Sequence, residues 1–198
     1  MHKLSVVIIT KNEESNIGRC IDSVKDLAHE IIVVDSGSTD RTQEIAEQSK
    51  NVRFIQSKWM GYSKTKNFGN DQAEGDYILS LDADEALDDM SRQSVQHVLN
   101  DPQNRAYKIP RLTNYCGKWI YHCGWRPDEQ LRLFPKGRAR WNENVVHEKL
   151  IVDPELEIQT LDGDILHYSY STLADHIHRI NTYTSLGASQ VLEKHKRL

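Results

Sequence analysis

Short apolar runs alternate with amphipathic stretches over the first hundred residues of the chain. The run Leu4–Thr10 is continuous and rich in β-branched residues, which is typical of a strand buried on both faces. Comparable runs occupy residues 30–34, 52–55 and 76–81, and helical spacing of apolar residues predicts helices over 17–27, 40–46, 62–73 and 88–99. Four strand–helix pairs in succession predict an α/β fold with a mostly parallel central sheet and helices on both faces.

The pattern changes beyond Asp101. Prolines separate short segments that are rich in Tyr, Trp and Arg. These segments predict antiparallel strands and loops, with short strands near 130–134 and 164–167. A last stretch, 172–196, has the apolar spacing of a helix. No repeat, low-complexity tract or linker separates the two halves, so we expect a single domain over residues 1–198.

Composition narrows the class of protein. The chain has 198 residues, of which 38% are hydrophobic, and its net charge of -4 argues against general nucleic-acid binding. No apolar run approaches the roughly 20 residues that span a bilayer, and the apolar start is too short for a signal peptide. Three cysteines do not make a disulfide framework. We therefore expect a cytoplasmic protein.

The net charge hides an asymmetry between the two halves. The first hundred residues carry 11 Lys/Arg against 17 Asp/Glu, whereas the remaining residues carry 14 against 12. Five of the acidic residues lie between Asp82 and Asp89, a density that requires solvation or a cation. The two halves are therefore expected to meet different ligands.

Three polar clusters follow predicted strands directly, at residues 10–13, 35–40 and 82–85. Because the carboxyl ends of parallel strands meet at one edge of a sheet, these clusters are expected to lie together and to bind a ligand. One cluster alone could be an ordinary loop with helix-capping residues. Three at the same edge favour a ligand site.

Missing motifs restrict the choice of ligand. The first strand-to-helix turn has neither the Gly-rich turn of NAD enzymes nor the phosphate loop of ATPases, so side chains and a metal must hold a nucleotide. Asp82-Ala83-Asp84 places two carboxylates at the end of a strand, and such oxygen ligands bind Mg²⁺ or Mn²⁺ together with diphosphate oxygens.

The sequence resembles a known family, the family 2 inverting glycosyltransferases of GT-A fold. The resemblance rests on four segments in order: VVIITKNE (6–13), IVVDSGSTDRT (32–42), KTKNFG (64–69) and LDADE (81–85). A later region, with QLRLF (130–134), Trp141 and VHE (146–148), resembles a bacterial branch that includes lipopolysaccharide inner-core β-glucosyltransferases.

The resemblance implies roles for particular residues. Asp35 would accept the N3–H of uracil, and Asp82 would contact the ribose or metal-bound water. Asp84 would bind Mg²⁺ or Mn²⁺, and His167 lies where many GT-A enzymes carry a second ligand to this metal, although a lone strand histidine can also be structural. The full nucleotide site is expected to comprise Thr10, Asn12, Glu13, Asp35, Ser36, Lys66, Asn67 and Asp82. For Lys66, a solvated helix lysine is the alternative.

Inverting transfer also needs a base for the acceptor hydroxyl, and the second half must contribute it. Glu148 is the candidate, by resemblance to the late acidic position of the family. Asp128 and Glu129 are rivals.

An acceptor wall is expected from Trp125, Arg126 and Trp141, since aromatic rings pack against sugar faces and arginines pair with phosphates. The alternative is that these residues fill the core beneath an irregular region. The basic residues of this half fit a phosphorylated saccharide-lipid acceptor and an anionic membrane surface: Arg132, Lys136, Arg138 and Arg140.

The expected function is therefore inverting transfer of a hexose from a UDP-sugar to a hydroxyl of a bacterial surface glycan. Glucose is the expected hexose, and the lipopolysaccharide core is the expected acceptor. Residues 1–100 would bind the nucleotide-sugar and 101–170 the glycolipid or oligosaccharide acceptor. Residues 171–198 would form a helix cut short by the end of the chain, at the cytoplasmic face of the inner membrane. The alternatives are transfer to polyprenyl phosphate or exopolysaccharide, a nucleotidylyltransferase and a non-catalytic sugar-nucleotide-binding module.

Overall fold

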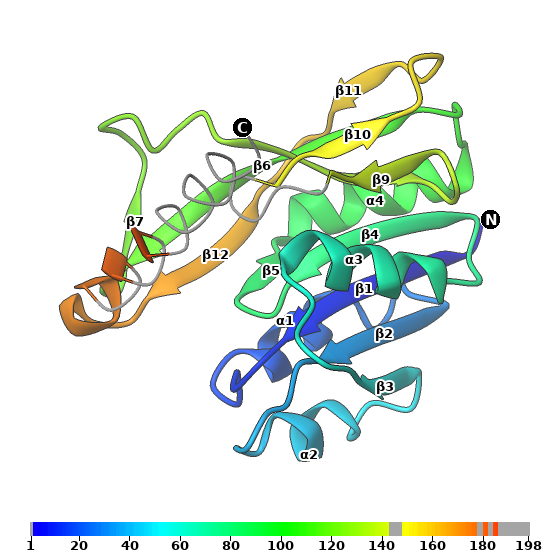
Figure 1. Ribbon diagram of the computed structural model, residues 1–198. Coiled ribbons are helices and arrows are strands. Elements are labelled where there is room, and N and C mark those ends of the chain that lie inside the picture. Colours follow the sequence, from blue (N-terminus) through cyan, green and yellow to red (C-terminus); the bar gives the residue numbers. More distant parts are fainter. Residues whose placement is uncertain (1, 143–147, 178–179, 182–183, 186–198) are drawn as a thin grey trace, which may run out of the picture.

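The computed structural model describes residues 2–142, 148–177, 180–181 and 184–185. Helices and strands alternate in the first half, and strands dominate the second (Figure 1). In chain order the elements are β1 (Leu4–Thr10), α1 (Ile17–Val24), β2 (Glu30–Asp35), α2 (Thr42–Ala46), β3 (Val52–Gln56), α3 (Tyr62–Asp71), β4 (Tyr77–Asp82), β5 (Glu85–Leu87), α4 (Asp89–Asn100), β6 (Ala106–Tyr115), β7 (Lys118–Ile120), β8 (Glu129–Pro135), β9 (Ala139–Trp141), β10 (Leu150–Val152), β11 (Ile158–Thr160) and β12 (Ile165–Tyr170).

One sheet runs through both halves of the chain in the order β3-β2-β1-β4-β8-β6-β12-β5. The first four strands are parallel, as predicted, whereas β8 is antiparallel to both of its neighbours. The register pairs Thr10 with Asp35 and Ile9 with Asp82, so β1, β2 and β4 end side by side. The expectation that the three polar clusters meet at one edge is therefore confirmed.

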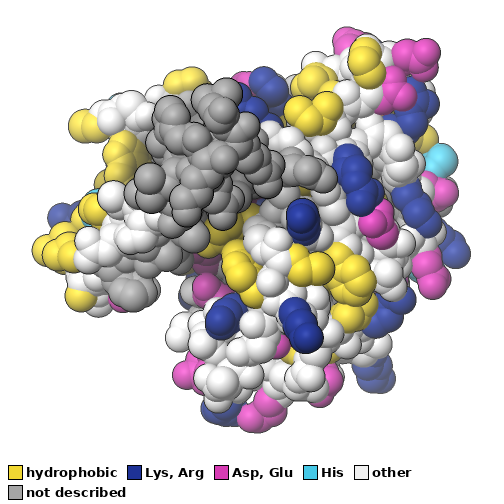
Figure 2. All heavy atoms as spheres, viewed as in Figure 1, with side chains coloured by type: hydrophobic (Ala, Val, Ile, Leu, Met, Phe, Trp, Pro, Cys, Tyr) yellow, Lys and Arg dark blue, Asp and Glu magenta, His cyan; other side chains and the backbone are white. Residues whose placement is uncertain are grey.

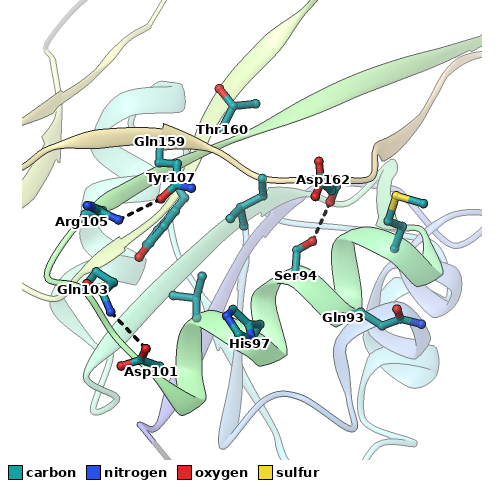
Figure 3. Close-up of a pocket in the computed structure, with 13 residues that line it drawn as sticks. Gln93, Ser94, His97, Asp101, Gln103, Arg105, Tyr107, Gln159, Thr160 and Asp162 are labelled. Atoms are coloured by element: carbon teal, nitrogen blue, oxygen red, sulfur yellow. Dashed lines mark hydrogen bonds between the residues drawn. The ribbon is translucent and has the colours of Figure 1, made fainter.

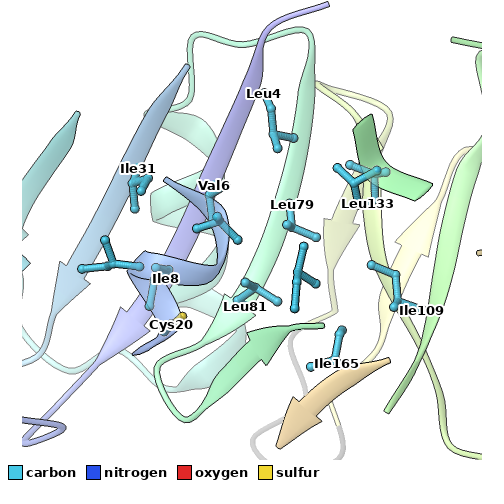
Figure 4. Packing of buried hydrophobic residues seen from close by; sticks show 14 of the residues in the cluster. Leu4, Val6, Ile8, Cys20, Ile31, Leu79, Leu81, Ile109, Leu133 and Ile165 are labelled. Atoms are coloured by element: carbon cyan, nitrogen blue, oxygen red, sulfur yellow. The ribbon is translucent and has the colours of Figure 1, made fainter. Parts of the chain in front are cut away.

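Two hydrophobic cores cover the two faces of the parallel strands. Val6 and Ile8 of β1 pack with α1 and α4 on one face (Figure 4), while Val7 and Ile9 pack on the opposite face with apolar residues next to α3. Successive strand residues point to opposite faces, and both faces are covered by helices. This explains why the run is apolar throughout rather than alternating, and it confirms the prediction of a doubly covered sheet.

Helix α3 lies unusually close to the sheet because of a glycine. A Cβ built on Gly69 would come within 2.4 Å of Cγ1 of Val7 and 3.1 Å of Cγ2 of Val34. Any side chain at this position would push the helix away from β1 and β2. The glycine thus sets the depth at which the preceding residues of α3 reach the end of the sheet.

Strand β6 was missed by the sequence prediction because Pro110 lies inside it. Proline lacks the backbone N–H that a ladder needs and is normally found at strand edges. One edge of β6 is paired first with β11, as far as Lys108, and then with β12, from Arg111 onward. Pro110 lies between these two paired stretches and therefore has no strand partner on that edge. The predicted short strands are confirmed as β8 and β12.

The predicted final helix is described only in part. Residues 173–177, 180–181 and 184–185 are helical, and the rest of 172–196 lies outside the described residues or precedes the helix. Among the described residues, no helix combines the length and the apolar character that crossing a membrane requires.

Candidate functional site

The loops that follow β1 and β2 are tied to each other by side chains. Asn12, at a φ of 56°, accepts a hydrogen bond from the backbone N–H of Thr39 at 2.8 Å, and its own N–H donates to Oγ of Ser38 at 2.8 Å. The N–H of Glu13 donates to the hydroxyl of Thr42 at 2.8 Å. The predicted nucleotide residues Asn12 and Glu13 therefore lie in a rigid double loop beside the end of β2.

Asp35 lies at the floor of this double loop and is 1% exposed. Its Oδ2 accepts hydrogen bonds from the N–H groups of Gly37 and Ser38, both at 2.9 Å. Beside it, the hydroxyls of Thr10 and Ser36 are buried and have no hydrogen-bond partner within the described part of the chain. Buried hydroxyls without partners are rare, so they suit a polar ligand.

The third cluster is joined to the rest of the site by a buried lysine. Nζ of Lys66 lies 2.9 Å from Oδ1 of Asp82 and 3.4 Å from Oε1 of Glu148. Its side chain is 2% exposed and lies 4.5 Å from the ring centre of Trp141. The alternative of a solvated helix lysine is therefore wrong. The structure places the candidate base Glu148 beside a carboxylate of the predicted nucleotide site.

Asn67, the next residue of α3, bonds the backbone of Trp141 in both directions. Its Nδ2 donates to the carbonyl oxygen and its Oδ1 accepts from the N–H, both at 2.9 Å. Because the amide is engaged in this way, Asn67 ties α3 to β9. Trp141 itself is 7% exposed, which favours the core-filling interpretation over an open acceptor wall for this residue.

A second buried cation completes the surroundings of Asp82. Nη2 of Arg132 lies 3.1 Å from Oδ2 of Asp82 and 2.8 Å from Oε1 of Glu85. Burial alone would raise the pKa of Asp82, but attraction to Lys66 and Arg132 outweighs it and holds that pKa far below its usual range. Asp82 is thus ionised with both of its oxygens paired.

Asp84 and His167 are brought together from distant parts of the sequence. Oδ2 of Asp84 lies 3.4 Å from Nε2 of His167, and the two side chains are 8% and 14% exposed. A carboxylate and an imidazole are suitable ligands for Mn²⁺. The described residues contain no cluster of three or more metal-binding side chains. Asp84 and His167 could supply two ligands to a metal ion, and Mg²⁺ in nucleotide sites commonly takes further ligands from water and from phosphate oxygens.

A cavity of about 380 Å³ opens next to His167 on the side of β6 and β12. Trp125 and Asp128 line it, and Oδ2 of Asp128 lies 2.8 Å from Nε of Arg111. Arg126 lies nearby in an ion pair with Asp164 at 2.8 Å. The surface is hollowed between the part that carries β7 and β12 and the part that carries β1 and α2, with acidic side chains in the hollow (Figure 2).

Of the basic residues expected to meet a phosphorylated acceptor, Lys136 and Arg140 are exposed, whereas Arg132 is not. Arg132 is 2% exposed and lies inside the site rather than on the surface. Arg138 pairs with Asp153 at 2.8 Å, and Arg140 pairs with Asp71 at 2.9 Å. Asp153 reaches Arg138 because β10 pairs with β9, and Asp71 reaches Arg140 from the end of α3; the sequence pattern revealed neither contact.

A larger cavity, of about 670 Å³, lies between α4, β6 and β11 (Figure 3). Its polar lining includes Ser94, which donates to the carbonyl oxygen of Asp162 at 3.0 Å, and Arg105. None of the residues predicted for the nucleotide, metal, base or acceptor lines this cavity. Volume alone therefore does not locate the site that the strand ends form.

Comparison with known proteins identifies the family. A family model described as Glycosyl transferase family 2 matches residues 5–149. The chain belongs to this family. Among curated relatives, an uncharacterized glycosyltransferase of Rickettsia typhi is 30% identical over all of this chain and 70% of its own length. The lipopolysaccharide core biosynthesis glycosyltransferase LpsC of Rhizobium meliloti is 32% identical over 98% of this glycosyltransferase and 73% of its own length.

Solved structures agree on the fold. S. aureus TarS superposes with a TM-score of 0.62 at 18% identity over 84% of this glycosyltransferase and 60% of the TarS chain. TarS in complex with UDP gives a TM-score of 0.63 at 18% identity, over 88% of this chain and 62% of the TarS chain. The glycosyltransferase thus spans less than two thirds of these structures. The GT-A fold expected from the sequence is confirmed.

Sequence reasoning missed the roles of Glu85, Arg111 and Arg132 in this glycosyltransferase. Glu85 is 1% exposed, and its Oε2 accepts the backbone N–H of Asp82 at 3.0 Å. The sequence did hold a signal for Arg132, which is a charged residue between Leu131 and Leu133 in an apolar strand. Charged residues are almost never fully buried unless they are paired, so this position indicated a buried arginine with an acidic partner.

Proposed function

We propose that this glycosyltransferase transfers a hexose from a UDP-sugar to a hydroxyl group with inversion at the anomeric carbon. One observation carries the proposal: Lys66 ion-pairs with both Asp82 and Glu148, which brings a carboxylate from the second half to the predicted donor site. An inverting transferase needs this juxtaposition of a donor site and a base. The UDP named in the TarS complex supports uridine as the nucleoside of the donor.

The donor would lie across the ends of β1, β2 and β4. Asp35 accepts the N3–H of uracil, and the unpartnered hydroxyls of Thr10 and Ser36 supply hydrogen bonds to the uridine. Asp82 orients the ribose, and Lys66 offers a positive charge to the diphosphate. A pyrimidine without an N3 proton, such as cytosine, could not donate a hydrogen bond from N3 to the carboxylate of Asp35.

Transfer would begin when Glu148 accepts the proton of the acceptor hydroxyl. The acceptor oxygen forms a bond to the anomeric carbon as the bond from that carbon to the diphosphate oxygen breaks, and UDP leaves with the electron pair. Asp84 and His167 would hold Mg²⁺ or Mn²⁺, which as a Lewis acid would offset the negative charge on the departing diphosphate.

The acceptor would be a saccharide of a bacterial surface glycan. The similarity to LpsC, a lipopolysaccharide core biosynthesis glycosyltransferase, supports a lipopolysaccharide acceptor. Trp125, 37% exposed beside the cavity at His167, offers a ring for a sugar face. Transfer to polyprenyl phosphate or exopolysaccharide is an alternative with the same chemistry. A second alternative is a binding module without catalytic activity. Release of UDP from UDP-glucose distinguishes an enzyme from such a module.

Thermal unfolding with UDP, CDP, GDP and ADP, each with and without Mn²⁺, tests the donor site. UDP with Mn²⁺ at a hundredfold excess over Kd is expected to stabilise the protein by about 2.7 kcal/mol. Asp84→Asn should lose this stabilisation because it removes a metal ligand. Asp89→Asn is the matched control, since its carboxylate is 94% exposed at the start of α4. Equal responses to all four nucleotides, or none to UDP with Mn²⁺, would refute the proposed donor.

Peripheral contact with the cytoplasmic face of the inner membrane is a further part of the proposal. Leu173, Ile177 and Ile180 are 64%, 60% and 50% exposed, at the spacing of one helix face. The protein should cosediment with vesicles that contain anionic phospholipid, and Leu173→Glu with Ile177→Glu should release it. Equal sedimentation of the native and doubly substituted proteins would rule out this face as the contact.

A further inference from the structure

An unbroken chain of ion pairs crosses the molecule from the donor side to the acceptor side. It alternates negative and positive side chains, and each neighbouring pair lies within 3.4 Å. In order, its members are Glu148, Lys66, Asp82, Arg132, Glu85, Arg111 and Asp128. The candidate base Glu148 and its rival Asp128 thus stand at its two ends, and Arg132 stands at its centre.

Arg132 and Lys66 are the two deeply buried cations of this chain of ion pairs. The side chain of Arg132 is 3% exposed, whereas that of Arg111 is 23% exposed. The Nη2 atom alone reaches both Asp82 and Glu85, and the guanidinium lies 5.8 Å from the ring centre of Trp141. Attraction to these carboxylates outweighs the burial that would lower the pKa of Arg132, so that pKa is raised and the charge is permanent.

The contacts of Arg132 restrain the turn between β4 and β5 at both ends. Asp82 closes β4 and Glu85 opens β5, and Glu85 also accepts the backbone N–H of Asp82 at 3.0 Å. Side chain and backbone of Asp82 are therefore held by one pair, Arg132 and Glu85. Asp84 lies within the same turn, so the pair also fixes the carboxylate that faces His167.

The same pair reaches the acceptor cavity through Arg111. Oε1 of Glu85 lies 3.3 Å from Nη1 of Arg111, whose Nε lies 2.8 Å from Oδ2 of Asp128. Arg111 and Asp128 both line the cavity of about 380 Å³ next to His167. A displacement of Glu85 would therefore move the walls of both sites.

We propose that Arg132, together with Glu85, is a positioning residue of the transfer reaction: it orients Asp82 toward the donor and, through Arg111, orients Asp128 in the acceptor cavity. This inference rests on the proposed function. A purely structural role makes a different prediction, because removing one partner from a buried ion pair lowers the free energy of unfolding without selectively weakening donor binding. After Arg132→Met, Asp82 would still have Lys66 and Glu85 would still have Arg111 as partners.

Binding of UDP in the presence of Mn²⁺, measured by calorimetry, tests this role. Arg132→Met is expected to weaken UDP binding and to raise the donor KM about tenfold or more, the usual effect of losing a hydrogen bond to a charged group. Arg132→Lys keeps the charge and should recover part of the affinity. Arg105→Met is the control for loss of an arginine ion pair elsewhere: Nε of Arg105 lies 2.7 Å from Oε2 of Glu157, and this pair is not at the strand ends.

A double-mutant cycle separates positioning from a general loss of structure. If Arg132 acts through Asp82, Arg132→Met should weaken UDP binding far less in the Asp82→Asn background than in the native protein. Should Arg132→Met not fold, Arg132→Lys and Glu85→Gln provide the same comparison. Native UDP affinity and KM in Arg132→Met, or fully additive losses in the cycle, would overturn the inference while the proposed function stands. Failure of the native protein to bind UDP would overturn both.

Discussion

Glu148→Gln is expected to reduce sugar transfer by about a thousandfold, the range that a positioned general base contributes. The amide is nearly the same size as the carboxylate but cannot accept the proton of the acceptor hydroxyl. UDP binding should change little, because the diphosphate and uridine contacts lie on other residues. The measurement is the rate of UDP release from UDP-glucose with acceptor, alongside calorimetric binding of UDP.

Glu129→Gln is the matched control for this experiment. Glu129 opens β8 and pairs with Lys108 at 3.2 Å, with a side chain 39% exposed, so its substitution should leave transfer unchanged. Asp128→Asn examines the remaining rival, which is held by Arg111 at the acceptor cavity. If Glu148→Gln retained full transfer while Asp128→Asn abolished it, Asp128 would be the base and the assignment of Glu148 would be wrong.

Lys66→Met is expected to have the largest combined effect on stability and binding. Removing one partner from a buried ion pair leaves charge uncompensated and destabilises a protein by about 3 kcal/mol or more. Here the loss leaves Glu148 and one oxygen of Asp82 without their cation. Urea unfolding should show the lowered free energy of unfolding, and UDP affinity should fall because the diphosphate loses a positive charge.

Lys64→Met provides the comparison, because Lys64 is exposed on the same helix two residues earlier. The same substitution there should cost little stability, since exposed ion pairs and lysines contribute less than about 1 kcal/mol. Equal behaviour of Lys64→Met and Lys66→Met would contradict the buried position of Lys66 and its role between the two carboxylates.

The first half of the fold was predictable because its signals are local. Continuous apolar runs and helical spacing predicted β1 to β4 and their helices to within a few residues, and the parallel topology then placed the three polar clusters at one edge. The start of α4 was also readable, since Asp88 caps this helix through the N–H of Ser91 at 2.7 Å.

The second half resisted prediction because its structure depends on distant partners. Strand β6 continues through Pro110 only because of how β11 and β12 flank it, and β9 is fixed by the amide of Asn67, 74 residues earlier. Burial of Lys66 and Arg132 likewise depends on carboxylates far along the chain, so a surface role was the natural but mistaken expectation for Arg132.

The acidic first half now has a physical explanation. The repulsion between Asp82 and Glu85 is offset because Arg132 of β8 pairs with both carboxylates and Lys66 of α3 pairs with Asp82. The negative charge is therefore largely compensated from within the protein. Oδ2 of Asp84 lies 3.4 Å from Nε2 of His167, and these are the two side chains that we propose as ligands of a divalent cation.

A crystal structure with UDP and Mn²⁺, recorded at a wavelength where manganese scatters anomalously, tests the central claim most directly. One anomalous peak is expected between Asp84 and His167, with uracil bound against Asp35 and the diphosphate near Lys66. Density for UDP in the cavity between α4 and β11, or a manganese peak away from the strand ends, would contradict it.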